Sequence, residues 1–381
     1  MAHSKSILKS LACDPEGTFA TAASSAYSAY VDVPAEGIEW TPAQEFLDRA
    51  VQTRTLGAHV AGKAGAKGGK VKFRTGIPGC STSGASGVQV VAQPWLDELM
   101  QACGYAKDAD TGGVVTGSGS TTTSIDMTDS SGISVGSLVM INGEVRMVTA
   151  NSANTLTITP ALTGAPAAAD VVYAGANYTT SDGDPGTITL VAKGDGYLYR
   201  FLGCKGVVKL VEDDARKRPM LEFEFDADTF DTTEPSGSFP SRVLSNHIPS
   251  VVGSPFYWGS TKTVISGFAF DAGREMGPKL STQGTNGRAG WIIKDEKPTM
   301  GFKPYYASAY ATDFAAETAR SVLAQIGAAA QACFAVYAHQ AQITEGWNVG
   351  DIDGHLGHDV KTKILDTGSS AVTAPYTLAV F

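Results

Sequence analysis

The sequence is short of charge, of paired cysteines and of long apolar segments. Charged residues make up 18% of its 381 residues, and the apolar runs fall well short of the roughly 20 residues of a membrane-spanning helix, so no membrane span is expected. The net charge of −9 argues against general affinity for nucleic acid, because binding to phosphates needs a positive field. The five cysteines are an odd number without C-x-x-C spacing, which predicts reduced, buried thiols in a reducing compartment: Cys13, Cys80, Cys103, Cys204 and Cys333.

Glycine, by contrast, is abundant at 43 residues, which together with many Ser and Thr residues is typical of short strands and turns. The chain is long enough for two domains with cores of their own. Residues 1–26 are small and polar and predict an N-terminal arm, and residues 1–11 have no apolar segment of a signal peptide. Residues 235–256 are rich in proline and predict a linker.

The same order of elements occurs twice, once on each side of this linker. In the first half, a Gly- and Lys-rich loop (Gly62–Gly69) precedes a predicted strand (Lys70–Arg74) and a helix (Pro94–Cys103), and paired strands follow. In the second half, a polar loop (Ser281–Gly290) precedes strands, a predicted helix (Phe314–Gly327) and further strands. Duplication of a β-rich unit lets one subunit occupy two equivalent places in a ring, which favours a structural building block.

A separate β module is expected inside the first repeat, at residues 107–181. Asn142-Gly143 lies between two alternating apolar stretches, which is the strongest hairpin signal in the chain. The Gly-, Ser- and Thr-rich flanks at 112–124 and 174–181 look like hinges. We therefore expect a small module that projects outward and is dispensable for assembly.

One predicted strand, Leu221–Asp228, separates apolar from acidic residues. Leu221, Phe223, Phe225 and Ala227 fall on one face, and Glu222, Glu224, Asp226 and Asp228 fall on the other. Four carboxylates on one face repel one another. Two interpretations are open, an ordinary solvated face or a surface kept negative, such as the wall of a channel for a polyanion.

A basic stretch of opposite sign runs from Arg54 to Arg74 and contains no acid. It lacks interleaved aromatic residues and the Ser or Thr that follows Lys in a phosphate-binding loop, so neither single-strand stacking nor nucleotide binding is supported. The sequence favours a mobile loop that becomes ordered against an acidic neighbour. Its bases are Arg54, Lys63, Lys67, Lys70, Lys72 and Arg74.

Signals for catalysis are weak. Two His and three Asp lie within Asp351–Asp359, and these residue types could bind a metal. Two glycines, however, predict a flexible turn that does not bring His355 and His358 together. No nucleophile elbow is expected to raise a hydrolase above background. We therefore expect no enzyme, no metal and no cofactor.

Several of these stretches resemble one known family. Ile133–Thr149 resembles a decorating β module, and Gly203–Leu210 with Pro219–Phe225 resembles the closing strands of a first tube domain. Ile265–Met276, followed by Gly287–Ile293 and Lys297–Gly301, resembles the opening of a second. In this order the stretches are similar to tail tube proteins, the major tail proteins of long-tailed, siphophage-type bacteriophages.

The resemblance implies a mainly β fold with two tandem tube domains, each a β-sandwich with a flanking α-helix, plus the small all-β insertion. Its domains would be residues 27–106 with 182–234, and 257–381. Such domains join edge to edge into rings that stack into a tube, with trimeric pseudo-six-fold rings for a duplicated chain, and DNA passes through the lumen without specific binding. Implied partners are further copies of the chain and the tape measure, tail terminator and distal tail proteins; the implied location is the virion tail, assembled in the host cytoplasm.

Under this interpretation the acidic strand would face the lumen and the charged loops would reach the next ring. The lumen-facing candidates are Glu222, Glu224, Asp226 and Asp228. The inter-ring candidates are Arg54, Lys63, Lys67, Lys70, Lys72 and Arg288. The alternatives are another phage tail or baseplate component, a β-rich adhesin, and a metal-dependent hydrolase built around His355 and His358.

Overall fold

The computed structural model confirms a mainly β protein with a curled, half-barrel sheet. Of the residues that the structure describes, strands hold 59% and helices 6%, the latter including two α-helices. Neither helix reaches the length and apolarity of a membrane span among the residues described. These residues are 9–47, 63–83, 89–108, 110–117, 119–181, 186–212, 218–242, 249–250, 253–284, 286–345, 349–352, 354–366 and 374–381.

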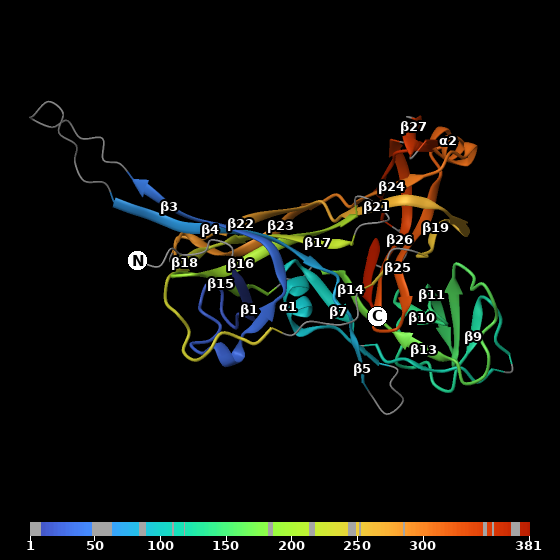
Figure 1. The fold of residues 1–381 in the computed structure, drawn as a ribbon, viewed down its shortest axis with the longest axis horizontal. Helices are drawn as coiled ribbons and strands as arrows, with labels where there is room; N and C mark the ends of the chain where they lie inside the picture. Colours follow the sequence, from blue (N-terminus) through green and yellow to red (C-terminus); the bar gives the residue numbers. More distant parts are fainter. Residues whose placement is uncertain are drawn as a thin grey trace, which may run out of the picture.

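An N-terminal strand set occupies the left and centre of Figure 1, with the helix α1 packed on one face of its sheet. Its main sheet runs in the order β3-β4-β17-β16, and β16 also pairs with β15 and β18, while β1 pairs with β15 and β2. The elements are β1 (Ser10–Pro15), a 3₁₀ turn (Tyr27–Ala29), β2 (Val31–Val33), β3 (Ala35–Leu47), β4 (Lys63–Gly76), α1 (Pro94–Ala102), β15 (Ile188–Gly194), β16 (Tyr197–Glu212), β17 (Met220–Ala227) and β18 (Thr229–Asp231).

A C-terminal strand set has a second sheet at the upper right of Figure 1, in the order β21-β24-β29-β26, while its β22–β23 hairpin lies over the centre of the picture, beside the N-terminal set. Here β26 also pairs with β25 and β30, and β19 pairs with β25 and β20. The elements are β19 (Phe256–Trp258), β20 (Thr261–Thr263), β21 (Ile265–Asp271), β22 (Arg274–Leu280), β23 (Arg288–Glu296), β24 (Thr299–Pro304), α2 (Ser308–Ala315), β25 (Ala319–Ala329), β26 (Ala332–Glu345), β27 (Val349–Ile352), β28 (His355–His358), β29 (Val360–Ile364) and β30 (Tyr376–Val380).

The two strand sets repeat one pairing scheme in the same chain order. Strands β1, β2, β3 and β4 have the pairings that β19, β20, β21 and β24 have in the second set, and an α-helix follows in each case. Strands β15, β16, β17 and β18 then correspond to β25, β26, β29 and β30. The two four-stranded sheets, β3-β4-β17-β16 and β21-β24-β29-β26, therefore share one strand order. Counted along the chain, each has its first, second, fourth and third strands side by side.

Backbone pairing joins the two sets within the chain. Lys209–Glu212 of β16 pair with Phe268–Asp271 of β21 in four antiparallel residue pairs, which we call the β16–β21 seam. A second joint lies on the α1 side, where β30 pairs with β14 (Ala176–Thr180) and β14 pairs with β7 (Tyr105–Asp108). The seam makes one continuous sheet of both sets.

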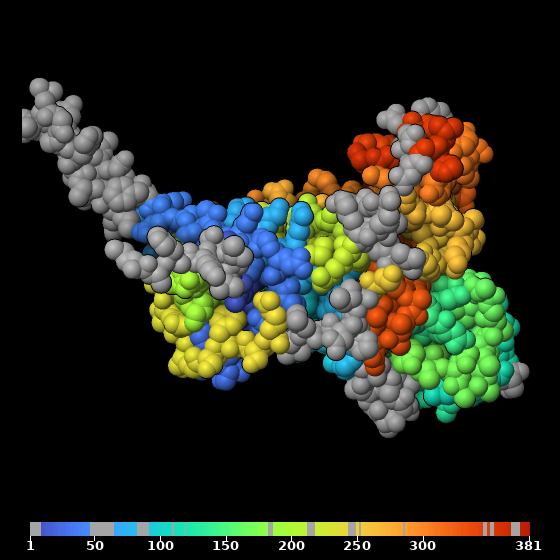
Figure 2. Space-filling model, in the orientation of Figure 1, coloured from blue at the N-terminus to red at the C-terminus, as the bar shows by residue number. Residues whose placement is uncertain are grey.

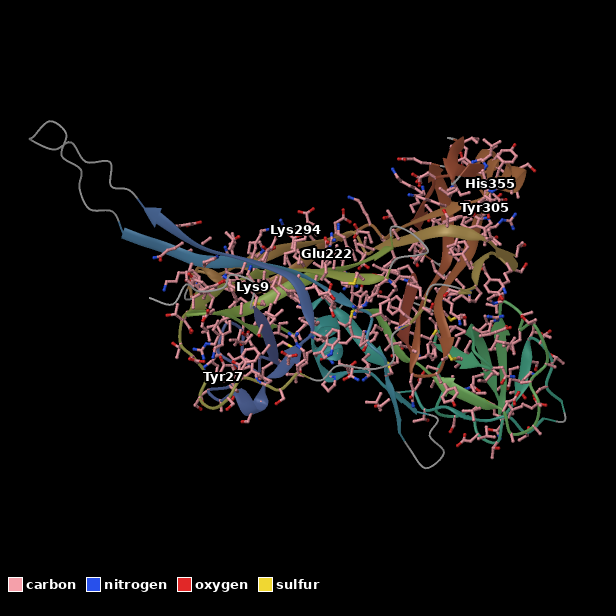
Figure 3. The ribbon with its side chains drawn as sticks, in the orientation of Figure 1. Lys9, Tyr27, Glu222, Lys294, Tyr305 and His355 are labelled. Carbon is pink, nitrogen blue, oxygen red and sulfur yellow. The ribbon has the colours of Figure 1, made fainter. Side chains whose placement is uncertain are left out.

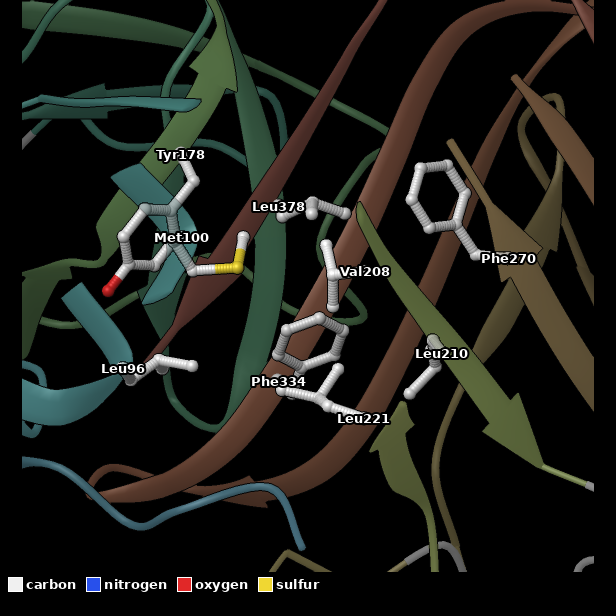
Figure 4. Close-up of a pocket in the computed structure, with 9 residues that line it drawn as sticks. All are labelled: Leu96, Met100, Tyr178, Val208, Leu210, Leu221, Phe270, Phe334 and Leu378. Carbon is white, nitrogen blue, oxygen red and sulfur yellow. The ribbon is translucent and has the colours of Figure 1, made fainter. Parts of the chain in front are cut away.

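The core between α1 and the sheet is dry and close-packed. In Figure 4, Leu96 and Met100 of α1 face Val208, Leu210 and Leu221 of the sheet across a cavity of about 10 Å³. Its lining is wholly apolar, and the space is near the minimum for a single water, so we expect it to stay empty. This cavity is packing slack and offers no ligand site.

Residues 110–174 fold as a small closed barrel, shown in green in Figures 1 and 2. Its strands pair in the order β8-β13-β10-β11-β12-β9, and the bridge between Val115 and Met127 closes the ring. The predicted hairpin at Asn142-Gly143 is confirmed. The strands are β8 (Gly113–Val114), β9 (Ser124–Asp126), β10 (Leu138–Ile141), β11 (Glu144–Ser152), β12 (Thr155–Thr159) and β13 (Val171–Ala174), and the short β5 (Ser81–Ser83) and β6 (Gln89–Val91) extend this sheet.

The expectation of a freely hinged module is wrong, because the barrel shares the main core. Leu138, Met140, Val145 and Met147 belong to the same buried cluster as the two large sheets, while the barrel's interior is a separate cluster. The side chain of Gln325, in β25, accepts from the Val145 amide at 2.9 Å and donates to the Gly143 carbonyl at 2.7 Å. Figure 2 shows the barrel packed directly against the C-terminal set.

Three other local predictions also failed. The predicted helix Phe314–Gly327 is largely β25, because cross-strand pairing and burial on both faces override the helix propensity of its alanines. Ser10–Pro15, placed in the arm, form the buried β1. Residues 63–69, predicted as loop, belong to β4 together with the correctly predicted strand Lys70–Arg74: Gly69 is needed there because a Cβ would lie 2.7 Å from the Phe201 ring.

Replacing Gln325 with Ala should lower the free energy of unfolding by about 1–3 kcal/mol, because a buried amide and carbonyl of the barrel lose their partner. Denaturant unfolding measures this. The matched control is Thr157→Ala on the exposed side of the same barrel, expected within about 0.5 kcal/mol of the wild type. Equal effects of the two substitutions would mean that Gln325 does not anchor the barrel.

Candidate functional surface: the charged face of the continuous sheet

The face of the sheet turned away from α1 carries the predicted acidic residues. In β17 the alternation is as predicted up to Ala227, with Leu221, Phe223 and Phe225 buried on the α1 side. Glu222, near the middle of the sheet in Figure 3, points to the opposite face with Glu224 and Asp226. These three candidates therefore lie together on one surface.

The fourth candidate, Asp228, does not continue this pattern. It is buried after the end of β17, where Asn286 donates to it at 3.2 Å and Arg288 lies 3.7 Å away. Burial raises the pKa of its carboxyl. Arg288, predicted to reach the next ring, thus contacts its own chain through Asp228 and also stacks over Trp291.

The predicted acidic face is matched by bases on the neighbouring strand. In the register of β4 and β17, Lys70, Lys72 and Arg74 lie opposite Asp226, Glu224 and Glu222. Arg74 Nη2 lies 2.6 Å from Glu222 Oε2, Lys72 Nζ lies 3.1 Å from Glu222 Oε1, and Lys70 Nζ lies within 3.4 Å of Glu224 and Asp226.

The basic stretch and the acidic face are consequently one structure and not two. The bases do face an acidic neighbour, and Lys70, Lys72 and Arg74 lie on the predicted strand Lys70–Arg74 and not in the mobile loop expected for the wider basic stretch. Of the other inter-ring candidates, Lys67 lies over the Phe230 ring, Lys63 begins β4, and Arg54 lies outside the described residues. The face predicted as acidic is therefore charge-balanced along β4 and β17.

Cross-strand partners continue this balance across the seam. Residues directly opposite in antiparallel strands share a face. Lys209 of β16 lies opposite Glu222 on one side and Asp271 of β21 on the other, with Lys209 Nζ 2.7 Å from Asp271 Oδ2. The whole row, which we call the cross-strand row, is Glu36, Arg74, Glu222, Lys209, Asp271, Thr299, Lys363 and Gln342, from β3 through to β26.

On this charged face, the pKa shifts of Glu222, Lys209 and Lys70 have the direction that ion pairing produces. Burial alone would raise the pKa of Glu222, but hydrogen bonds from Lys72 and Arg74 outweigh it and lower the pKa overall. The hydrogen bond to Asp271 raises the pKa of Lys209, and the charge of Asp226 raises that of Lys70. Glu222, Lys209 and Lys70 are therefore held in their charged forms at neutral pH.

The clefts formed by the described residues include two that are open to solvent. One, of about 650 Å³, lies between the β3–β4 hairpin and the β22–β23 hairpin and is lined by residues of both signs, including Lys67, Lys70 and Asp226. The other, of about 440 Å³, lies on the C-terminal part of the sheet over Ala269 and Gly301, flanked by Lys361 and Glu345. Neither holds a cluster of three metal-ligating side chains within the described part of the chain.

The His- and Asp-rich segment is a hairpin, not the flexible turn predicted. Strands β27 and β28 pair, with His355 exposed beside Tyr305, as Figure 3 shows at the far end of the C-terminal set. His358 is buried and stacks on Tyr306. Alternation in the strand turns the two imidazoles to different environments, which gives no support to a hydrolase built around them.

Sequence reasoning missed one pattern and several partners. Gly132–Gly136 does match G-x-S-x-G, but Ser134 lies between turns of the barrel and donates to Asp110 at 2.9 Å, without the strand-to-helix turn of a nucleophile elbow. Arg74, Lys209 and Asp271 were not among the site candidates. The sequence did contain a signal for Arg74, because the bases at 70, 72 and 74 have the same two-residue spacing as the acids at 222, 224 and 226.

In comparisons with known proteins, no family model matches the chain and no curated protein is significantly similar to it.

Reversing the acids by E222K/E224K/D226K should destabilise the fold by about 2–3 kcal/mol, because each new cation would face Lys70, Lys72, Arg74 or Lys209. The neutral control E222Q/E224Q/D226N should cost less than about 1 kcal/mol. Denaturant unfolding at low and high salt separates them, since salt screens only the like-charge repulsion. A salt-independent difference would remove electrostatics from this explanation.

The acid limb of the stability curve should depend on Glu222. A carboxyl whose pKa is lowered in the folded state adds stability above its unfolded pKa of about 4.3, and that stability is lost as pH falls through the folded value. E222Q should therefore flatten the loss of stability below about pH 4.3. Unfolding curves at stepped acidic pH test this, and parallel curves for wild type and E222Q would contradict it.

Proposed function

We propose that the chain is a structural virion protein that polymerises into stacked rings and forms the hollow tail tube of a long-tailed phage. The observation that carries this proposal is that the two similar strand sets of one chain are joined edge to edge by the β16–β21 seam. If the same edge-to-edge pairing also joins one chain to the next, it places successive strand sets around a closed ring. The two tandem tube domains of the proposal are these two sets.

The edges left over are suited to the same operation between chains. In the part of the chain that the structure describes, β3 pairs only with β4, and Ile343–Glu345 at the end of β26 pair only with β29. By the repeated scheme, β3 corresponds to β21 and the end of β26 corresponds to the end of β16. Joining the end of β26 to β3 of a second copy satisfies both open edges, which would otherwise invite uncontrolled pairing.

The charged face then becomes the inner wall of the tube. Its bases are occupied by acids at 2.6–3.4 Å, so DNA phosphates meet no row of unpaired cations along β4 and β17. A passing polyanion needs a surface without favourable binding wells, and charge balance provides one as well as net negative charge would. Tape measure, tail terminator and distal tail proteins are the further partners of this proposal.

Purified protein should assemble into hollow tubes of uniform width with three chains per ring, because each chain supplies two of six places. Negative-stain images and class averages, with ring mass from native mass spectrometry, measure both properties. Rings of six chains would overturn the assignment of two places per chain. An adhesin or baseplate component would give no tubes at all under assembly conditions.

A further inference from the structure

A buried cation links the two strand sets on the α1 side of the sheet. The side chain of Arg274, at the start of β22, is 1% exposed. It donates to the carbonyl of Cys103, which caps the end of α1, and its guanidinium carbon lies 4.1 Å from the centre of the Tyr105 ring. A residue of the C-terminal set thus contacts the helix and the following strand of the N-terminal set.

The counter-charge comes from the hairpin partner of Arg274. Glu296 of β23 lies 3.2 Å from Arg274 Nε, and Tyr376 of β30 donates to Glu296 at 2.7 Å. The hydroxyls of Tyr376 and Tyr105 lie 3.1 Å apart, which closes the network. These four side chains, Arg274, Glu296, Tyr105 and Tyr376, together with the Cys103 carbonyl, form what we call the Arg274 brace.

The Arg274 brace lies at a distance from the β16–β21 seam, so it can restrict bending of the two strand sets about the seam. The β16–β21 seam has only four residue pairs, and the second joint, in which β30 pairs with β14 and β14 pairs with β7, lies on the α1 side together with the brace. The brace contacts α1, on the opposite side of the sheet from the cross-strand row. Together with the β30–β14–β7 joint, the brace therefore connects the two sets at a distance from the seam, and a connection at that distance limits bending about the seam.

We propose that Arg274 is the positioning residue that sets the angle between the two strand sets, and through it the curvature at which a second copy of the chain is added. The inference rests on the proposed function, since a ring closes only if the seam within the chain bends as much as the seam between chains. A guanidinium suits this role because its planar fork serves a carbonyl, a carboxylate and an aromatic face at once.

The test measures the angle in the free chain and the curvature in the assembly. Spin labels on S28C, in the N-terminal set, and K262C, in the C-terminal set, report the distance between the two sets by double electron–electron resonance. Both positions are exposed, and the five native thiols are buried. The test variant is R274M/E296Q, which removes both charges and leaves neither buried and unpaired. The matched control is R146M, because Arg146 is equally buried but anchors the barrel through Tyr257.

R274M/E296Q should broaden the inter-label distance distribution about twofold and raise the concentration needed for assembly about tenfold, with tubes of variable width. R146M should leave the distance distribution and the tube width unchanged even if it lowers the unfolding temperature. A distribution as narrow in R274M/E296Q as in R146M would overturn the proposal.

Two further outcomes keep the inference separate from folding and from the proposed function. If R274M/E296Q does not fold, R274K serves, because one ammonium keeps the charge but cannot span Cys103, Glu296 and the Tyr105 ring; an unchanged distance distribution in R274K then counts against the brace. If the wild type forms no closed rings, the tube proposal fails, while the distance measurement still decides whether Arg274 fixes the angle.

Discussion

The β16–β21 seam is the constraint on which the rest of the structure depends. Four backbone residue pairs convert two sheets of the same design into one, and everything on the two faces of that sheet takes its position from this register. On one face the register places Lys209 between Glu222 and Asp271. On the other it brings β22 against the end of α1, where Arg274 reaches the Cys103 carbonyl. A shift of one residue would turn both sets of contacts to the wrong face.

The sequence allowed prediction of what depends on neighbours along the chain. The Asn142-Gly143 hairpin and the alternation in β17 were predictable because a turn and a strand face are local properties. The failures share a cause: the deciding partner is distant in sequence. The composition of β25 is typical of a helix, and only its pairing with β26 shows that it is a strand. The composition of β4 is typical of a loop, and only the contact with Phe201 explains why position 69 needs glycine within a strand. The ion pairs between β4 and β17 were predictable only as two halves, since their acids and bases lie about 150 positions apart.

Charge balance also changes what the acidic strand costs. Four carboxylates on one face looked like a stability penalty accepted for function. With three of them facing Lys70, Lys72 and Arg74, and the fourth buried beside Asn286, the penalty is largely removed. Exposed pairs of this kind contribute little stability individually. Their effect is on the surface, which carries many charges and a small local field.

The two strand sets share a backbone scheme but not the chemistry of their exposed face. The N-terminal set presents the ion pairs of β4 and β17, whereas the C-terminal set presents an open cleft over Ala269 and Gly301 with the Lys361–Glu345 ion pair at its edge. Backbone pairing needs only compatible edges and register, so a repeat can diverge in side chains while its hydrogen bonds stay the same. A ring built from such chains would therefore be six-fold in its backbone and three-fold in its surface chemistry. Any partner inside the lumen that recognises side chains would meet three equivalent sites, while one that responds only to the width of the channel would meet six.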